Sequence, residues 1–223
     1  MSQIAILIPA YNICRHLSSL LQELTVLYHS TNIVIVDDGS RDGTTVRLSK
    51  RFRQVHFLRH EQNRGKGAAL KTGIRYIIDR FEVSAITFMD GDGQHPANSI
   101  KDFIAKRNLN KARFIIGARD FSQESMPWPR VVSNTITSFL INLKLQTTIT
   151  DSQCGFRLLD VYLLITVLPI SADGYDFETA LLIKAGRISE IAEVKIPTVY
   201  ADEKSSIRPL RDMIKFVHTY LTT

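Results

Sequence analysis

Residues 85–96 read AITFMDGDGQHP, an apolar run that ends in two aspartates, Asp90 and Asp92, separated by a single glycine. The run before Asp90 is typical of a short strand that is buried on both faces. Two carboxylates this close repel each other unless a cation or a proton lies between them. The stretch therefore predicts a buried strand with a charged site at its carboxyl end.

Similar strands alternate with helical patterns along the first half of the chain. Further strands are expected at 4–8, 32–36, 55–60 and 113–119. This alternation predicts an α/β fold with a mainly parallel central sheet and helices on both faces. Ligands of such sheets bind beyond the carboxyl ends of the strands, so the polar segments 37–40, 63–67 and 90–95 would converge on one crevice. We see no repeat or linker and predict one domain over 1–223.

Two later segments, 131–145 and 209–221, carry apolar residues at helical spacing. In the second segment the apolar face lies opposite Arg211, Lys215 and His218. A basic amphipathic helix is typical of an anchor on a membrane surface. A helix packed on the protein core gives the same pattern, and both interpretations stay open.

The composition narrows the classes of partner. The formal net charge of +6 and the pI of about 9.4 favour anionic partners such as nucleotides, nucleic acid or an acidic membrane surface. With 9% aromatic residues and no ordered basic–aromatic motif, nucleic acid is the least favoured. The two cysteines, Cys14 and Cys154, have no metal-binding spacing and are expected to be free thiols. No segment has the length of a membrane span or the pattern of a signal peptide, so we expect a soluble or peripheral protein.

Three interpretations of the aspartate pair compete. A surface turn is the simplest, because Asp and Gly are common in turns. A phosphatase of the haloacid dehalogenase type would have Thr or Val where this chain has Gln94. A divalent-cation site suits the close hard oxygens, and Mg²⁺ or Mn²⁺ would take a few carboxylates plus substrate phosphates. Gln94 and His95 are further candidate ligands, although a hydrogen bond within the loop is the favoured role for His95.

Neighbouring segments favour the cation site. Gly65 and Lys66 precede a predicted helix, and backbone N–H groups at a helix N-terminus bind phosphate. The segment lacks the full pattern of an ATPase P-loop. Asp37 and Asp38 follow a predicted strand and offer carboxylates suited to a ribose or a base edge.

Six segments together resemble a known family. IPAYN, VDDGSRDGT, NRGKGAALKTG, DGDGQHP, GAR and DSQCGFR occur in the order and at the spacing of family 2 glycosyltransferases with the GT-A fold. Residues 196–212, IPTVYADEKSSIRPLRD, are similar to the polyprenyl-phosphate glycosyltransferases within that family. The resemblance covers essentially the whole chain.

The resemblance implies inverting transfer of a sugar from a UDP- or GDP-linked donor to a polyprenyl phosphate, with Mg²⁺ or Mn²⁺. The metal and the donor diphosphate would be held by Asp90, Asp92 and Gln94. The binding site for the base and ribose would be lined by Pro9, Tyr11, Asp37 and Asp38. Gly65 and Lys66 would approach the donor. The acceptor phosphate would be received by Arg119, Arg130 and Asn134, which with Asp92 form the implied catalytic set. Ser206 and Arg208 would close over the diphosphate.

The acceptor chemistry supports a phosphate. Sugar hydroxyls normally need a carboxylate base, whereas a lipid monophosphate is already ionised at neutral pH. The chain lacks the Glu-Asp pair that polysaccharide-making relatives carry as a base. Asp151 is the nearest alternative base, and a capping role suits it equally. The segment of Glu178 faces the sugar by resemblance, but an acid at a helix N-terminus is an equal explanation.

One departure from the family concerns the base: Ile13 stands where the family usually has a Glu that reaches the base, so base preference cannot be copied over. Many relatives continue into membrane-spanning helices, whereas this chain ends at Thr223. We expect it to work at the cytoplasmic face of a membrane, held by its amphipathic helices or by a membrane-protein partner. The alternatives are a transferase that uses a glycan or lipid-linked sugar hydroxyl, and a catalytically silent module that binds nucleotide sugar or membrane.

Overall fold

The computed structural model describes residues 3–119, 128–197 and 209–223, with side chains at all of these except 128–130, 209–212 and 214. Its strands are β1 (Ile4–Ala10), β2 (Ile33–Asp37), β3 (His56–Arg59), β4 (Ala85–Phe88), β5 (Phe114–Arg119), β6 (Arg157–Asp160) and β7 (Ile191–Ile196). Its α-helices are α1 (Cys14–Leu27), α2 (Thr44–Arg51), α3 (Lys66–Arg80), α4 (Ile100–Asn110), α5 (Trp128–Leu145), α6 (Val161–Val167), α7 (Asp176–Gly186) and α8 (Pro209–Thr222). Two short 3₁₀ turns, Ser30–Asn32 and Ala97–Ser99, complete the described elements.

The seven strands form one sheet in the order β3-β2-β1-β4-β6-β5-β7. All pairings are parallel except those of β6, which runs antiparallel to β4 and β5. The predicted mainly parallel α/β sheet is therefore confirmed. The sequence patterns missed β6 and β7, because β6 has only two apolar residues between Arg157 and Asp160 and β7 interrupts its apolar residues with charged ones.

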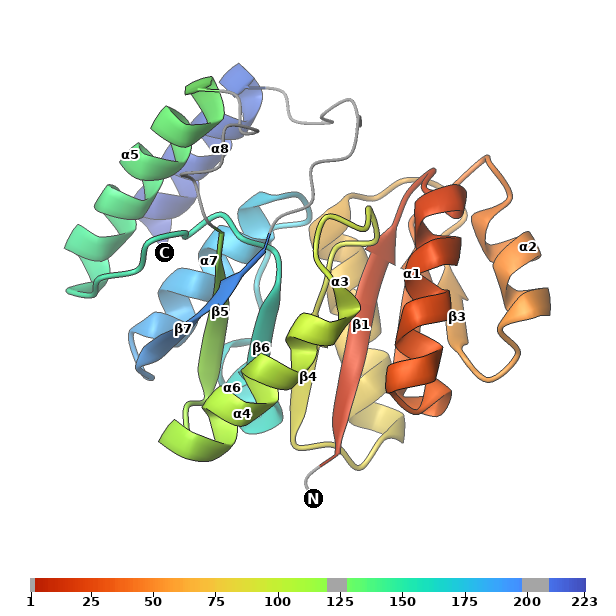
Figure 1. The fold of residues 1–223 in the computed structure, drawn as a ribbon. Coiled ribbons are helices and arrows are strands. Elements are labelled where there is room, and N and C mark those ends of the chain that lie inside the picture. The colour runs from red at the N-terminus through yellow and green to blue at the C-terminus, as the bar shows by residue number, and fades with distance from the viewer. Residues whose placement is uncertain (1–2, 120–127, 198–208) are drawn as a thin grey trace.

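Helices cover both faces of the sheet, with α1 and α4 in front and α3 and α7 behind in Figure 1. Their apolar residues close the core against the strands, and all five residues of β2 are buried. Strands covered on both faces read as continuous apolar runs, which explains why the first-half strands were visible in the sequence.

The segment that leads into β6 is fixed by Arg157, whose side chain is only 1% exposed. Its guanidinium donates hydrogen bonds to the carbonyls of Ser152, Cys154 and Glu178, at 2.7 to 3.0 Å. One buried side chain therefore joins the 152–157 loop to α7. This join brings the end of the sheet and the start of a helix into one rigid unit.

Helices α5 and α8 lie side by side beyond the end of β5 and β7, outside the two helical layers (Figure 1). The Lys144 ammonium donates to the Tyr220 carbonyl and lies 4.6 Å from the centre of the Tyr220 ring. Each helix leaves apolar side chains exposed at helical spacing: Ile136, Phe139 and Leu143 on α5, and Met213, Val217 and Leu221 on α8. None of the described helices has the length and apolar character needed to cross a membrane.

Candidate active site

Polar segments meet at one edge of the sheet. Asp38 follows β2 and Asp90 follows β4, while Arg119 ends β5. Because β6 runs antiparallel, its starting residue Arg157 lies opposite Phe88, and the preceding loop reaches the same edge. The predicted convergence at the carboxyl ends of the parallel strands is therefore observed.

The centre of this edge is an ion cluster around Lys66. The Lys66 ammonium lies 2.6 Å from Asp90 Oδ1 and 2.9 Å from Glu178 Oε2. Burial alone would lower the pKa of Lys66, but the two carboxylates outweigh it and raise that pKa above its ordinary value. Burial alone would raise the pKa of Asp90, yet the ion pair with Lys66 holds it below its ordinary value. At neutral pH the cluster therefore combines one cation with ionised Asp90.

Gly155 lies directly against the cluster. A Cβ atom at this position would lie 2.6 Å from Asp90 Oδ2 and 2.9 Å from Lys66 Nζ. A larger residue here would have to push the ends of these two side chains aside, so the glycine lets the loop before β6 pass beside the ion pair without displacing it. The QCGFR segment thus supplies a close approach rather than a reactive group.

The start of α3 is locked to the loop before α7. The Ala68 amide donates to the Asp173 carbonyl at 3.0 Å, and Lys71 pairs with the Asp173 carboxylate at 2.5 Å. Gly65 has a φ of +102°, and a Cβ there would meet the Asp173 carbonyl oxygen at 2.5 Å. Two helix N-termini, those of α3 and α7, are therefore held together beside Lys66.

Asp37 and Asp38 are buried and hold protein groups. Asp38 accepts hydrogen bonds from His60 and from the amides of Arg64 and Gly65, at 2.7 to 2.9 Å. Asp37 accepts from the Ser40 amide and the Thr45 hydroxyl. The two carboxylates thus shape the loops after β2 and β3, and their contact with a nucleoside stays a prediction.

The other residues expected near the nucleoside lie at the end of β1. Pro9 is half-buried within the strand, and Tyr11 is exposed. The Asn12 amide donates to Ser40 Oγ, and Asn12 Oδ1 accepts from the Arg41 amide. The loops after β1 and β2 therefore form one surface beside Tyr11.

Ile13 also reaches the aspartate pair from this side. A Cβ at Gly91 would lie 2.6 Å from Ile13 Cδ1. The apolar residue that replaces the expected Glu thus packs under the Asp90–Asp92 turn.

Asp92 and Gln94 form a tight turn, in which the Gln94 amide donates to Asp92 Oδ1 at 3.0 Å. Within the described residues, no three His, Cys, Asp or Glu side chains converge as metal ligands. Two carboxylates and an amide fit Mg²⁺ or Mn²⁺ when substrate phosphates complete the shell. Asp90 already binds a cation, the Lys66 ammonium, so the donor set suits positive charge.

His95 is packed inside the protein beside the aspartate pair. The ring is 3% exposed and stacks on Phe156 with centroids 5.5 Å apart. Burial lowers the pKa of His95 to about 4, so the ring is neutral at pH 7. Its Nδ1 atom has no hydrogen-bond partner among the described residues, and the hydrogen bond expected for this ring within the loop stays a prediction.

Asp151 organises the far end of the crevice. Its carboxylate accepts from Arg119 Nε at 2.6 Å, from Arg119 Nη2 at 3.0 Å and from Asn134 Nδ2 at 3.0 Å. The residue has no exposed surface. A general base must reach the acceptor, so this geometry disfavours the base role considered for Asp151. It brings together two of the residues expected to receive the acceptor, Arg119 and Asn134.

Three predicted residues lie outside the described side chains: Arg130, Ser206 and Arg208. Two residues shape the site in ways that the sequence did not predict, Gly155 and Arg157. Both belong to the segment DSQCGFR, which the resemblance singled out without giving these two residues a role.

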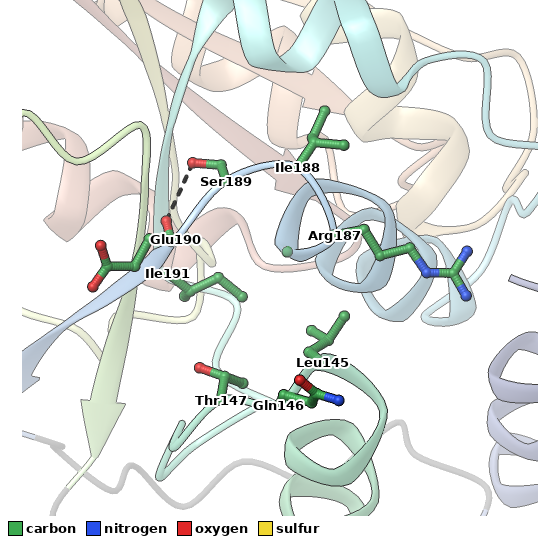
Figure 2. A pocket seen from close by; sticks show the side chains of 9 residues that line it. Leu145, Gln146, Thr147, Arg187, Ile188, Ser189, Glu190 and Ile191 are labelled. Atoms are coloured by element: carbon green, nitrogen blue, oxygen red, sulfur yellow. Dashed lines mark hydrogen bonds between the residues drawn. The ribbon is translucent and has the colours of Figure 1, made fainter.

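A pocket of about 350 Å³ lies elsewhere (Figure 2). It is lined by residues 145–147 and 186–191, at the ends of α5 and α7 and the start of β7. Because β7 runs parallel to β5, this start lies at the opposite edge of the sheet from Arg119. The pocket is therefore separate from the crevice.

Sequence comparison identifies the family. The family described as Glycosyl transferase family 2 matches residues 5–168. UDP-N-acetylglucosamine–dolichyl-phosphate N-acetylglucosaminyltransferase of Methanococcus voltae is 32% identical, covering 96% of this chain and 92% of its own. Undecaprenyl-phosphate mannosyltransferase of Micrococcus luteus is 27% identical, covering 86% and 82%.

Structural comparison gives the fold. Glucosyl-3-phosphoglycerate synthase of Mycobacterium tuberculosis, solved with Mn²⁺, UDP and glucosyl-3-phosphoglycerate, superposes with a TM-score of 0.72. The match covers 99% of this chain and 79% of that chain at 21% identity. At this identity the likeness establishes the GT-A fold alone.

Proposed function

This chain belongs to glycosyl transferase family 2, and we propose that it transfers a sugar from a nucleotide-diphosphate sugar to a polyprenyl phosphate at a membrane surface. The relatives named above transfer sugars to dolichyl or undecaprenyl phosphate. The observation that carries the proposal for this chain is the Arg119–Asp151–Asn134 cluster, because it fixes a cation at this end of the crevice while its own carboxylate, Asp151, is buried and engaged and so cannot serve as a base.

The acceptor chemistry follows from this cluster. A hydroxyl acceptor must lose a proton as it attacks, and the carboxylate of this cluster, Asp151, is buried and engaged. A phosphate monoester arrives ionised, so it needs orientation and charge stabilisation rather than deprotonation. The Arg119 cation suits that task, and Asn134 and Arg130 are proposed to join it.

The donor would bind on the other side of the ion cluster. Asp90, Asp92 and Gln94 would hold Mg²⁺ or Mn²⁺, which neutralises the charge of the departing nucleotide diphosphate. Pro9, Tyr11, Asp37 and Asp38 border the proposed nucleoside end, and Gly65 and Lys66 border the diphosphate. Ser206 and Arg208 are proposed to close over the same group.

The reaction is a single displacement. A phosphate oxygen of the acceptor forms a bond to the anomeric carbon while the bond from that carbon to the donor diphosphate breaks. The nucleotide diphosphate leaves with the bonding electrons, and the anomeric configuration inverts. No proton moves in this step, which agrees with a crevice where the nearest carboxylate serves to hold an arginine.

The surface of α5 and α8 supports a location on the cytoplasmic face of a membrane. Their exposed apolar side chains lie on neighbouring helices beyond the acceptor end of the sheet (Figure 1). Lys215 and His218 lie on α8, and the net charge is +6. Exposed apolar side chains on a protein of net positive charge suit an anionic bilayer surface, where a lipid acceptor is found.

A transfer assay tests the proposal. Full-length protein is incubated with a short-chain polyprenyl phosphate and each of UDP-glucose, UDP-N-acetylglucosamine and GDP-mannose, with Mn²⁺ or EDTA. We expect a glycolipid from one donor that disappears with EDTA. Folded protein that glycosylates only the hydroxyl of an added glycan, or that binds donors without turnover, would overturn the acceptor assignment.

A further inference from the structure

The carboxylate that begins the aspartate pair already holds a cation of the chain itself. Asp90 Oδ1 lies 2.6 Å from the Lys66 ammonium. The other oxygen, Oδ2, faces the backbone of the loop before β6, since a Cβ at Gly155 would lie 2.6 Å from it. Only 16% of the Lys66 side chain and 29% of the Asp90 side chain are exposed. Water and salt therefore screen this ion pair less than a surface pair.

A divalent cation that binds Asp90 has to share this carboxylate with the ammonium. Two cations on one carboxylate lie close together, and their repulsion is strong where water is scarce. A nucleotide diphosphate changes the balance of charge. Its anionic oxygens can accept hydrogen bonds from Lys66 and can also serve as ligands of the cation. The nucleotide can therefore relieve the repulsion that opposes the cation on its own.

Glu178 offers the ammonium a second place. Its Oε2 lies 2.9 Å from Lys66 Nζ, and the Glu178 side chain is nine-tenths buried. The other oxygen, Oε1, has no hydrogen-bond partner among the described residues. Buried carboxylate oxygens are nearly always hydrogen-bonded, so this one is available to a donor that moves. An ammonium released from Asp90 can stay in the site by contacting both oxygens of Glu178.

The exchange needs movement of the Lys66 side chain alone. The backbone on both sides of Lys66 is packed against the segment before α7. A Cβ at Gly65 would meet the Asp173 carbonyl oxygen at 2.5 Å, and one at Gly67 would meet the Gly174 carbonyl oxygen at 2.8 Å. The ammonium lies at the end of a flexible four-carbon stem. It can therefore change partners while the start of α3 stays in place.

We propose that Lys66 competes with the divalent cation for Asp90 and so makes cation binding depend on the nucleotide diphosphate. Without the nucleotide, the ammonium bridges Asp90 and Glu178. When the diphosphate enters, Lys66 leaves Asp90 for the diphosphate and Glu178, and the Asp90 carboxylate becomes available to the cation. This inference rests on the proposed function, since it requires a nucleotide-diphosphate donor and a cation at the aspartate pair.

Binding of Mn²⁺ to the full chain tests the competition without any turnover. The free ion is followed by electron paramagnetic resonance during a titration, first without nucleotide. We expect Lys66→Met to bind Mn²⁺ at least about tenfold more tightly than wild type does. Lys66→Met combined with Asp92→Asn should lose this gain, because the cation binds at the aspartate pair.

Repeating the titration with UDP or GDP, whichever the wild type binds, measures the dependence on the nucleotide. The factor by which the nucleotide tightens Mn²⁺ binding is a coupling between the two sites. We expect this factor to be at least about tenfold smaller in Lys66→Met than in wild type. The complex that Mn²⁺ forms with the nucleotide in solution is the same for both proteins, so it cancels in the comparison.

Lys71→Met is the matched control for the loss of one positive charge. Lys71 lies on the same helix but pairs with Asp173, so its removal leaves Asp90 occupied. We expect its Mn²⁺ affinity to stay within about twofold of wild type.

A double variant, Lys66→Met with Glu178→Gln, keeps the net charge of wild type and avoids two unbalanced acids in the site. It should still bind Mn²⁺ alone more tightly than wild type, and thermal unfolding checks that it is folded. A wild type that binds Mn²⁺ alone as tightly as both Lys66 variants do, or an equal gain in Lys71→Met, would overturn the inference alone. A wild type that binds no nucleotide or nucleotide sugar with Mn²⁺ present would overturn the proposed function together with it.

Discussion

Asp151 has no exposed surface and accepts three hydrogen bonds from the side chains of Arg119 and Asn134. A bidentate Arg–carboxylate pair fixes the plane of the guanidinium as well as its position. The buried acid therefore orients the acceptor-side cation without touching the acceptor itself. At the scale of single residues, this ion pair holds one cation of the crevice in a fixed geometry.

Replacing Asp151 tests whether it positions or deprotonates. Asp151→Asn leaves Arg119 without its buried counter-charge, so we expect stability to fall by roughly 3 kcal/mol. Acceptor KM should rise about tenfold, with the shape of the pH–rate profile unchanged. Initial rates at varied acceptor concentration and pH measure both.

A general base would behave differently under the same change. Loss of a base costs 10²- to 10⁴-fold in kcat and removes the acidic limb of the pH–rate profile. That result would restore the hydroxyl-acceptor alternative. Thermal unfolding of the variant, run alongside, keeps a folding defect apart from a catalytic one.

Asp92 carries the second prediction at this scale. Asp92→Asn removes one of the two carboxylates available for a divalent cation, so we expect metal-dependent turnover to fall at least about 100-fold with the fold intact. Titration of activity with Mn²⁺ checks this. Asp79→Asn, an exposed acid on α3, is the control and should keep full activity. Normal turnover by the Asp92 variant would remove the metal-site assignment.

Among elements, α5 and α8 differ from the other helices in their surface. Both lie outside the layers that cover the sheet, and each exposes apolar residues along one stripe (Figure 1). The helices are tied to each other through Lys144 and Tyr220. A pair of neighbouring stripes presents a broader apolar surface than one helix can.

Membrane binding tests that surface. Phe139→Asp and Val217→Asp place a charge on each stripe, and we expect each to weaken binding to anionic vesicles at least about tenfold. Co-sedimentation with phosphatidylglycerol–phosphatidylcholine vesicles measures it. Val26→Asp is the matched control, because Val26 is 85% exposed on α1, away from both stripes. Equal losses in all three variants would exclude α5 and α8 as the membrane surface.

At the scale of the whole molecule, the protonation of the Cys154 thiol depends on whether the chain is folded. Both cysteines are free, but Cys14 is half-buried whereas Cys154 is buried beside Gly117. Burial, with a smaller contribution from Asp151, raises the pKa of Cys154 from 9.0 to about 12. The folded protein therefore keeps this thiol protonated where the unfolded chain does not.

The sign of the pH dependence follows. Below pH 9 both states hold the proton, and between pH 9 and 12 only the folded state does, so stability falls as pH rises. At pH 10 the loss from this group is on the order of 1 kcal/mol, and Cys154→Ala should lack it. Denaturant unfolding at pH 8 and pH 10 measures the difference. An equal loss in the variant would contradict the assignment.

The first half of the fold could be predicted from the sequence, because strands buried on both faces are written as apolar runs. β1, β2, β4 and β5 were found in this way. β6 and β7 were not, since the two leucines of β6 lie between charged residues and the apolar residues of β7 are interrupted by Glu193 and Lys195, so neither forms an apolar run. The aspartate pair could be recognised as a candidate site because it directly follows the apolar run of a predicted strand.

The sequence by itself determined the family, the α/β class and the set of charged residues at the strand ends, because these depend on local patterns and on the order of motifs. Only the tertiary structure decided which charges pair. Lys66 meets Glu178 across 112 positions of chain, and Asp151 meets Arg119, since contacts between distant segments depend on how the strands are ordered in the sheet. The sequence alone does not distinguish a carboxylate that acts as a base from one that holds a neighbouring side chain or binds a ligand. The burial of the side chain and its hydrogen-bond partners in the fold separate these roles.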